Sequence, residues 1–223
     1  MDKDHNLKPE LPAGNFSTWL DKIRNAQLSG DGMDVPCGEC TACCRSFQFI
    51  HIGSNEKQTL ARIPKELLFP APGQPEGYML MGYDSEGRCP MLVENTCSIY
   101  TDRPLTCRNY DCRIFPATGI KIDDKNMTLI AERTRFWKFG FNSDRDREAH
   151  KAVQTAVAFL RKNAESFPGG EVPCNATQLA ILAIKVYDVF LEHQTDSGTH
   201  DREHLPAKIV NAVIKANKKF EEK

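Results

Sequence analysis

Cys37-Gly-Glu-Cys40-Thr-Ala-Cys43-Cys44 is the stretch that decides the fold of this chain. Its spacing lets a loop turn successive sulfur atoms toward one centre, and a thiolate is a soft metal ligand. Four more cysteines follow after a gap without any: Cys89, Cys97, Cys107 and Cys112. A metal held by both groups would join distant segments and contribute folding free energy. The sequence therefore predicts a metal-organised domain with these eight cysteines as candidate ligands.

The redox setting of the cysteines follows from two features of the rest of the chain. The first ten residues contain no apolar segment of the kind that directs secretion. No run of about 18 apolar residues is present that would span a membrane. We therefore expect a cytoplasmic protein without membrane association. In a reducing cytosol, clustered thiols more often serve metal or redox chemistry than structural disulfides.

The spacing also bears on which metal is bound. Cubane iron-sulfur clusters are often held by a Cys-x2-Cys-x2-Cys run and one remote cysteine, whereas structural zinc usually takes two Cys-x2-4-Cys pairs. Cys37, Cys40 and Cys43 form such a run, and the second group has no Cys-x2-Cys pair. Iron or an iron-sulfur cluster is the favoured cofactor, with zinc as the alternative. The adjacent Cys43 and Cys44 point in different directions, so they either serve different metals or leave one thiol outside the site.

The cysteine segments resemble the YkgJ-type cysteine-cluster family. The resemblance rests on Cys37-x2-Cys40-x2-Cys43-Cys44, Gly87-Arg-Cys89-Pro-Met-Leu, Cys97-Ser-Ile-Tyr100 and Arg103-Pro-Leu-Thr-Cys107-Arg108, within roughly residues 37 to 115. Members are described as zinc- or iron-chelating proteins, so the resemblance implies a metal-binding function. A related branch with a similar cysteine pattern includes the flagellin lysine N-methylases, which implies an enzyme as an alternative.

Side chains between the cysteines are candidate cofactor-binding groups. Arg103 and Arg108 lie inside the motif, where guanidinium groups can offset thiolate charge or bind an anionic substrate. Tyr100 can donate a hydrogen bond to a cluster sulfur, although a tyrosine in a short apolar run more often packs as a ring. His51 is a candidate nitrogen ligand near Cys44, with a structural role as the alternative. Further arginines lie within a few residues of a cysteine: Arg45, Arg88 and Arg113.

Composition and charge limit the partners. The formal net charge of -1 argues against general electrostatic binding to nucleic acid. Residues 133–141 mix cations with aromatic rings, as single-strand binders do, but acidic residues follow at once, and interior packing of the rings is the favoured interpretation. The expected partners are a transition metal and a protein, either as a binding partner or as a substrate.

The hydrophobic pattern predicts an α+β fold. A small cysteine-rich, metal-centred core of short strands is flanked by an amino-terminal helix and by carboxy-terminal helices. Helices are expected at 16–28, from a Ser54 N-cap to Pro64, from about 146, from about 175 and after 206, and strands at 47–52, 78–83 and 125–131. Residues 1–14 are predicted to form a mobile arm, 15–131 the metal-binding core with the amino-terminal helix, and 132–223 a helical region packed on the core.

Three functions remain open from the sequence. The leading one is a metal-binding protein whose cysteines hold iron, an iron-sulfur cluster or zinc, with the metal structuring the fold or carrying an electron. The others are a metal- or cluster-dependent enzyme that resembles the lysine N-methylases and a zinc-structured protein-interaction module. Cys174 lies outside the motif and is expected to be an ordinary thiol at a helix start.

Overall fold

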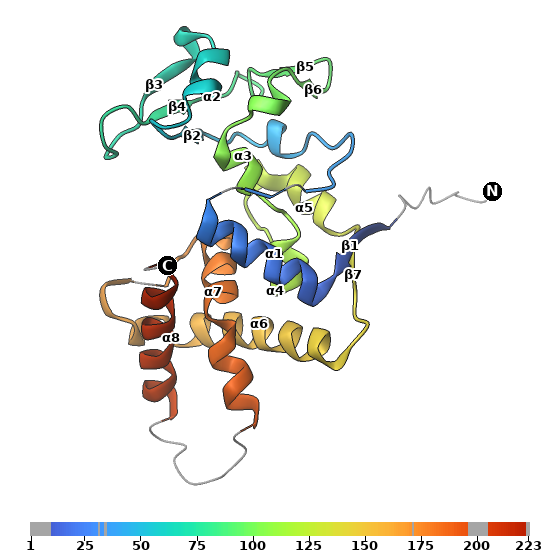
Figure 1. Ribbon diagram of the computed structural model, residues 1–223, viewed down its shortest axis with the longest axis vertical. Coiled ribbons are helices and arrows are strands. Elements are labelled where there is room, and N and C mark those ends of the chain that lie inside the picture. Colours follow the sequence, from blue (N-terminus) through green and yellow to red (C-terminus); the bar gives the residue numbers. More distant parts are fainter. Residues whose placement is uncertain (1–9, 31, 34, 171, 196–204, 222–223) are drawn as a thin grey trace, which may run out of the picture. The chain divides into compact units, whose positions relative to one another are not determined.

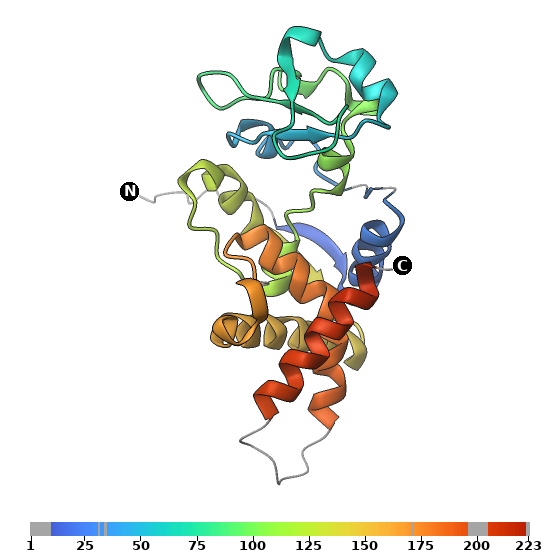
Figure 2. The ribbon, with the colours of Figure 1, turned by 90° about the vertical axis from the view of Figure 1, so that its left-hand side faces the viewer.

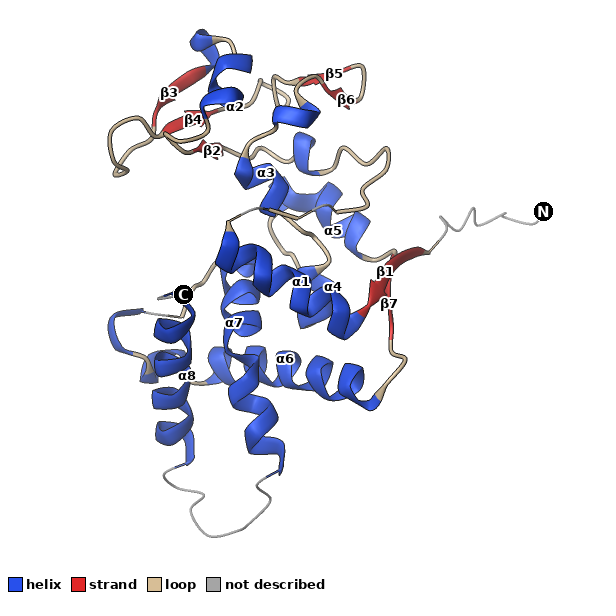
Figure 3. Cartoon of the chain, in the orientation of Figure 1, coloured by secondary structure: helices blue, strands red, loops and turns tan. Residues whose placement is uncertain are grey.

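The computed structural model describes residues 10–30, 32–33, 35–170, 172–195 and 205–221. The chain forms two compact units, each assembled from more than one segment. Unit 1 comprises residues 1–28, 113–121 and 134–223, and unit 2 comprises residues 29–112 and 122–133. Figures 1 and 3 show long helices in unit 1 and short strands and helices in unit 2. The predicted α+β fold class is confirmed.

Unit 1 combines helices with a two-stranded parallel sheet. Its helices are α1 (Phe16–Ser29), α4 (Ile114–Thr118), α6 (Asp144–Lys162), α7 (Ala176–Thr195) and α8 (Leu205–Glu221), and its strands are β1 (Leu11–Asn15) and β7 (Trp137–Gly140). Helix α7 packs against α6 and against α8, which lies beside it in Figures 1 and 2. Fully buried aliphatic side chains such as Leu160 of α6 and Ile184 of α7 fill this unit.

Helix α6 begins at a capping box. Ser143 accepts a hydrogen bond from the Asp146 N–H at 3.2 Å, and the Asp146 carboxylate accepts one from the Ser143 N–H at 2.8 Å. The same carboxylate accepts hydrogen bonds from Asn15 Nδ2 and the Ser17 N–H, which fixes the start of α1. Burial alone would raise the pKa of Asp146, but these hydrogen bonds outweigh it and hold the pKa well below its ordinary value.

Unit 2 contains short strands and short helices. A three-stranded antiparallel sheet has the order β2 (Ile50–Ile52), β4 (Met79–Met81) and β3 (Leu68–Pro70), and β5 (Leu92–Val93) forms a hairpin with β6 (Thr96–Cys97). The helices are α2 (Lys57–Arg62), α3 (Leu105–Asn109) and α5 (Thr128–Thr134), and the 3-10 turns are η1 (Cys43–Arg45), η2 (Lys65–Leu67), η3 (Tyr100–Asp102) and η4 (Lys125–Met127).

The apolar interior of unit 2 contains a small cluster that is continuous with the cysteines. Its buried members are Ile52, Ile63, Met81 and Ile99. Cys89 and Cys97 are half-buried and pack against this cluster. Cys97 is held there by the β5–β6 hairpin, whose turn residues Glu94 and Asn95 both have positive φ, as a type I′ turn requires.

Several predicted elements differ from the structure. Strand β2 is shorter than residues 47–52 because Phe47 has a φ of 52°, which interrupts an extended chain. Ser54 does not cap α2, whose N-cap position is Glu56. The strand predicted at 125–131 is wrong: Asp124 accepts a hydrogen bond from the Asn126 N–H at 2.8 Å and starts the helical turn that leads into α5.

The structure can be compared with the predicted mobile arm and with the predicted place of the amino-terminal helix. Residues 1–9 of the predicted mobile arm lie outside the described residues, and Leu11–Asn15 pairs with β7 as a strand. Helix α1 belongs to unit 1 together with the carboxy-terminal helices. The boundaries predicted for the metal-binding core, 15–131, and the helical region, 132–223, stay predictions. In the described part of the chain, no helix has the length and apolar character needed to cross a membrane.

Candidate metal centre

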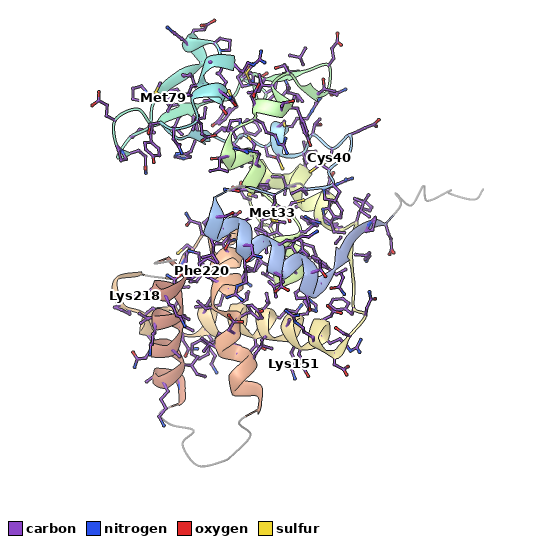
Figure 4. The ribbon with its side chains drawn as sticks, viewed as in Figure 1. Met33, Cys40, Met79, Lys151, Lys218 and Phe220 are labelled. Carbon is purple, nitrogen blue, oxygen red and sulfur yellow. The ribbon has the colours of Figure 1, made fainter. Side chains whose placement is uncertain are left out.

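All eight motif cysteines lie in unit 2. Cys37 and Cys40 are in the loop before η1, where Figure 4 labels Cys40, and Cys43 and Cys44 are in η1 itself. The second group is spread over the loop before β5, strand β6, helix α3 and the end of the following turn: Cys89, Cys97, Cys107 and Cys112. Cys174 is exposed and lies in unit 1. The nine cysteines are all described, and the structure joins none of them in a disulfide.

The first cysteine loop is shaped by its own backbone and by an arginine. The Cys40 N–H donates to the Cys37 carbonyl at 3.1 Å, which closes a turn from Cys37 to Cys40. Arg133 of α5 donates from Nη2 to the same carbonyl at 3.0 Å. After η1, Ser46 Oγ donates to the Ala42 carbonyl at 2.6 Å and closes the loop. Residues separated widely in sequence therefore fix the conformation of Cys37 to Ser46.

A second set of contacts places Cys89 beside Cys44. The Cys89 N–H donates to the Cys44 carbonyl at 2.7 Å, and the Phe47 N–H donates to the Gly87 carbonyl at 3.1 Å. Gly87 has a φ of 76°, and a Cβ atom there would come within 2.4 Å of the Phe47 ring. Only glycine allows this approach. The Gly87-Arg-Cys89 motif thus has a steric reason for its glycine.

Helix α3, which carries Cys107, is anchored at its start. The Glu56 carboxylate accepts the Leu105 N–H through Oε2 at 2.6 Å and the Gly53 N–H through Oε1 at 2.8 Å. Thr106 Oγ1 donates to the backbone carbonyl of His51 at 2.7 Å. These bonds satisfy one of the N–H groups that every helix start leaves open and tie α3 to β2. The side chain of His51 itself is exposed.

The thiols influence one another electrostatically. Burial, followed by the neighbouring Cys89 and Cys97, raises the pKa of Cys44 to about 11. Burial, followed by Cys89 and Cys44, raises the pKa of Cys107 to about 12, while the Arg103 charge acts in the opposite direction. Such thiols stay protonated at neutral pH, so a metal that binds them must displace their protons.

Cys43 and Cys89 have raised pKa values for the same reason. Cys43 keeps an exposed surface, but the surrounding protein excludes much of the water near its sulfur, and this raises its pKa well above the ordinary value. Cys112, Cys37, Cys44 and Cys40 raise it further, in that order. For Cys89, burial raises the pKa and exceeds the opposing effect of nearby backbone hydrogen bonds.

The predicted cofactor-binding residues have different surroundings. The Tyr100 ring is 57% exposed, and the Arg103 guanidinium stacks over it at 4.0 Å from the ring centroid while donating to the Tyr100 carbonyl at 2.8 Å. Tyr100 therefore packs against Arg103 and not in the core. Arg108 Nε is buried, and no acceptor for it is present among the described residues. Cofactor binding by Arg103, Arg108 and Tyr100 stays a prediction.

The other arginines near cysteines bind carboxylate, carbonyl or amide oxygens. Arg88 binds Asp84 at 2.8 Å and Glu86 at 3.3 Å on the surface. Arg113 belongs to unit 1, where its Nη1 donates to the Ala13 carbonyl at 3.1 Å. Arg45 donates to the Asn95 side chain of the β5–β6 turn. Of these three, Arg45 alone follows directly on a cysteine of η1.

The donor set fits a thiophilic metal by its chemistry. Eight sulfur donors gathered in one unit are the ligands preferred by zinc, by iron-sulfur clusters and by copper(I). Among the arginines, Arg103 acts on Cys107, where its charge lowers the pKa of the thiol against the larger effect of burial and so favours the thiolate that a metal binds. Within the described ranges, no three Cys, His, Asp or Glu side chains already converge as a metal site. Binding would therefore require rotation of cysteine side chains on a backbone that is already in place.

Sequence reasoning missed the residues that hold the cysteine segments together. Glu56 bonds a residue 49 positions away, and Arg133 bonds one 96 positions away. No spacing rule connects such residues. In the sequence, Arg133 stood out only as one cation of the mixed cationic and aromatic stretch 133–141. The rings of that stretch pack within unit 1: Trp137 is buried, and the Phe139 ring lies 5.2 Å from that of Phe16.

Comparison with known proteins supports the resemblance at the level of a sequence family. No curated protein sequence and no solved structure matches the chain. One family model matches residues 36–136, a range that includes every cysteine of unit 2. This segment matches the CxxCxxCC family, described as a putative zinc- or iron-chelating domain, and the resemblance that the cysteine motif indicates is thereby confirmed.

Proposed function

We propose that the protein binds a thiophilic transition metal through the cysteine thiolates of unit 2, with iron or an iron-sulfur cluster favoured over zinc. The observation that supports this most directly is the collection of eight cysteines from residues 37–112 in one compact unit. Four buried apolar side chains form the cluster on which Cys89 and Cys97 pack. A metal bound beside such a small cluster would supply much of the stabilisation that apolar burial does not.

The preference for iron rests on the first cysteine loop. Its Cys-x2-Cys-x2-Cys run is the arrangement typical of iron-sulfur proteins, and the Cys40-to-Cys37 hydrogen bond forms a turn in this run. When bound, such a centre would carry an electron or hold the fold together. The chain's own part is to supply the thiolates, to bury them and to place the Arg103 charge near Cys107.

Metal content tests the proposal directly. The full chain, purified anaerobically without a metal-affinity tag, is expected to contain stoichiometric iron with acid-labile sulfide and a broad absorption band near roughly 400 nm. Stoichiometric zinc without colour would keep the metal-binding function and overturn the preference for iron. Absence of any bound transition metal would overturn the function itself.

Two variants make this test specific. Cys40→Ser is expected to lower metal content and soluble yield together, because it removes a ligand from the first loop. Cys174→Ser is the matched control, since Cys174 is exposed and lies in the other unit. It is expected to retain full metal content. Equal metal content in both variants would remove Cys40 from the site.

A second candidate function, a metal-structured protein-interaction module, is favoured by aromatic rings on the surface of unit 2. Phe49 is 51% exposed, and its ring lies 4.9 Å from that of Tyr83 and 6.1 Å from that of Phe69. The Phe47 ring centroid lies 5.4 Å from that of Tyr83, and Phe47 is also exposed. Aromatic surfaces of this kind suit an apolar segment of a protein partner. Co-purification of one partner that is lost in Phe49→Ala but retained in Leu129→Ala, another exposed apolar residue, would support this function.

A further inference from the structure

The adjacent Cys43 and Cys44 have different neighbours. Both lie in the 3-10 turn η1, in which successive side chains are about 120° apart around the axis. Two neighbouring thiols on such a turn cannot both aim at one metal without distorting it. The thiols that act most strongly on Cys43 are Cys112 and Cys37, whereas those that act most strongly on Cys44 are Cys89 and Cys97. Cys44 and Cys40 also act on Cys43, and Cys40 and Cys37 also act on Cys44, but more weakly. The strongest neighbours of the two thiols are therefore different cysteines.

The backbone brings Cys112 toward the first cysteine loop. The Met33 N–H donates to the Arg108 carbonyl at 3.0 Å, so the segment that leads into Cys37 runs beside the end of α3, from which the chain continues to Cys112. Gly32 makes this crossing close, since a Cβ atom there would lie 2.8 Å from Arg108 Cβ. The Arg133 bond to the Cys37 carbonyl fixes the same loop from α5.

A separate set of backbone contacts surrounds Cys44. Cys89 is bonded to Cys44 through the 2.7 Å hydrogen bond described above, and the Leu92 N–H donates to the Cys89 carbonyl at 3.0 Å. Leu92 is paired in turn with Cys97 across the β5–β6 hairpin. Cys107 completes this set: the thiols that act on it are Cys89, Cys44 and Cys97, in that order.

We propose that the eight cysteines form two separate metal sites of four thiolates each, one made of Cys37, Cys40, Cys43 and Cys112 and the other of Cys44, Cys89, Cys97 and Cys107. The peptide bond between Cys43 and Cys44 is the boundary between them. This inference rests on the proposed metal-binding function. Each thiol releases its proton to solvent as its sulfur binds the metal.

The two sites differ in the chain segments that supply them. The first combines a Cys-x2-Cys-x2-Cys run with one remote cysteine, the ligand pattern of a cubane iron-sulfur cluster. The second takes single cysteines from four separate segments, so a metal there joins η1, the loop before β5, β6 and α3. Arginines accompany both: Arg133 contacts the first loop, and the Arg103 charge acts on Cys107 of the second.

Cys43→Ser and Cys44→Ser are a matched pair that tests the division. The metal-loaded variants are treated with iodoacetamide under native conditions, and alkylated cysteines are identified by mass spectrometry. Cys43→Ser is expected to expose Cys37, Cys40 and Cys112 to alkylation and to leave the second set protected. Cys44→Ser is expected to expose Cys89, Cys97 and Cys107 and to leave the first set protected. Alkylation of the same cysteines in both variants would overturn the two-site proposal.

Wild-type protein provides a test that does not depend on a variant's folding. With limiting chelator, the cysteines of the two sites are expected to become reactive in two groups of four. Cys174 reacts throughout, so single molecules should carry about one, about five or about nine alkyl groups. Release of all eight cysteines in one step would overturn the division while leaving metal binding intact. A wild-type chain whose eight cysteines all react before chelation would instead overturn the metal-binding function.

Discussion

The helices of unit 1 bury aliphatic side chains along their length, whereas the strands of unit 2 are only two or three residues long and cover a small apolar cluster. Leu160, Ile184 and Val186 are fully buried in unit 1, and the Phe159 and Phe190 rings of α6 and α7 meet at 5.6 Å. In unit 2, backbone and side-chain hydrogen bonds hold irregular loops around cysteines.

This contrast indicates two sources of stability in one chain. Apolar burial and helix packing stabilise unit 1 without any ligand. Unit 2 contains fewer large buried side chains and many thiols, so we expect its stability to depend on metal. Metal removal should therefore destabilise unit 2 selectively, and a cavity among the helices should destabilise unit 1 selectively.

Removal of the metal is expected to have the largest effect. Ligation of a structural zinc contributes about 10 kcal/mol in small cysteine-rich domains, which is as much as a whole domain's stability. A chelator with a reductant should therefore raise amide hydrogen exchange in β2, β4 and α3 sharply. Exchange in α6 and α7 should stay slow. Slow exchange throughout unit 2 after complete metal removal would show that its apolar cluster suffices.

A cavity in unit 1 is expected to destabilise unit 1 and to leave metal binding by unit 2 unchanged. Leu160 is fully buried in α6, and Leu160→Ala should lower the free energy of unfolding of unit 1 by about 3 kcal/mol, through lost burial and the cavity left behind. Metal content per chain should not change. Thermal unfolding followed by circular dichroism, with metal analysis on the same sample, checks both. A loss of metal comparable to that of Cys40→Ser would contradict the independence of the two sources.

The anchor of α3 is expected to have a smaller effect. Glu56→Gln leaves the Leu105 N–H with a weaker acceptor and should cost about 1–2 kcal/mol in unit 2. Faster alkylation of Cys107 in the metal-bound protein, where unit 2 is folded, is the expected readout by mass spectrometry. Glu66→Gln, at an exposed position of η2, is the control and should leave the rate unchanged. Equal rates in the two variants would remove Glu56 from this role.

The smallest expected effect is a pH dependence of the stability of unit 1. His150 lies between the Phe16 and Phe141 rings at 4.8 and 5.0 Å, and burial lowers its pKa, against a weaker opposing effect of the Pro116 carbonyl. Because the folded pKa lies below the unfolded value of about 6.5, the unfolded chain binds the proton more readily. The stability of unit 1 should therefore be complete above about pH 6.5 and fall as the pH drops toward the folded pKa.

A thermal scan from pH 7.5 to 5 checks this dependence. The expected decrease in Tm is no more than about 4 °C, since His150 is only half-buried. His150→Gln should remove the decrease in this range. Asp146, whose pKa is held low, loses its contribution only as the pH falls below about 4, so the two effects occur in separate windows. A decrease of the same size in His150→Gln would exclude His150 as its source.

The sequence predicted the helices of unit 1 better than the elements of unit 2. Long amphipathic patterns locate helices because the signal is local: the helix predicted from about 146 is α6, which begins at Asp144. The strand predicted at 125–131 failed because the side chain of Asp124 starts a helical turn that hydrophobic alternation does not reveal. Strand β2 was predicted too long because the left-handed Phe47 depends on the distant Gly87.

The sequence predicted the eight cysteines as metal ligands, which stays a prediction, and it did not indicate the residues that hold their segments in place. Cysteine spacing identifies the eight thiols because metal chemistry restricts the residue type so strongly. Glu56, Thr106 and Arg133 act through hydrogen bonds across long sequence separations, for which a single sequence carries no periodic signal. The division between Cys43 and Cys44 depends on the 3-10 geometry of η1, which the structure supplies.

The parallel pairing of β1 with β7 has a consequence for the order of events on the ribosome. Leu11 pairs with Trp137, so nearly all of unit 2 is synthesised between the two partners. At about 10 residues per second, the roughly 120 residues between β1 and β7 take about 12 s to emerge. The cysteines through Cys112 leave the exit tunnel before β1 can find its partner. At the same rate, the stretch from Cys112 to Trp137 takes about 2.5 s to emerge. The eight cysteines therefore have about that time to take up metal before β1 can pair with β7.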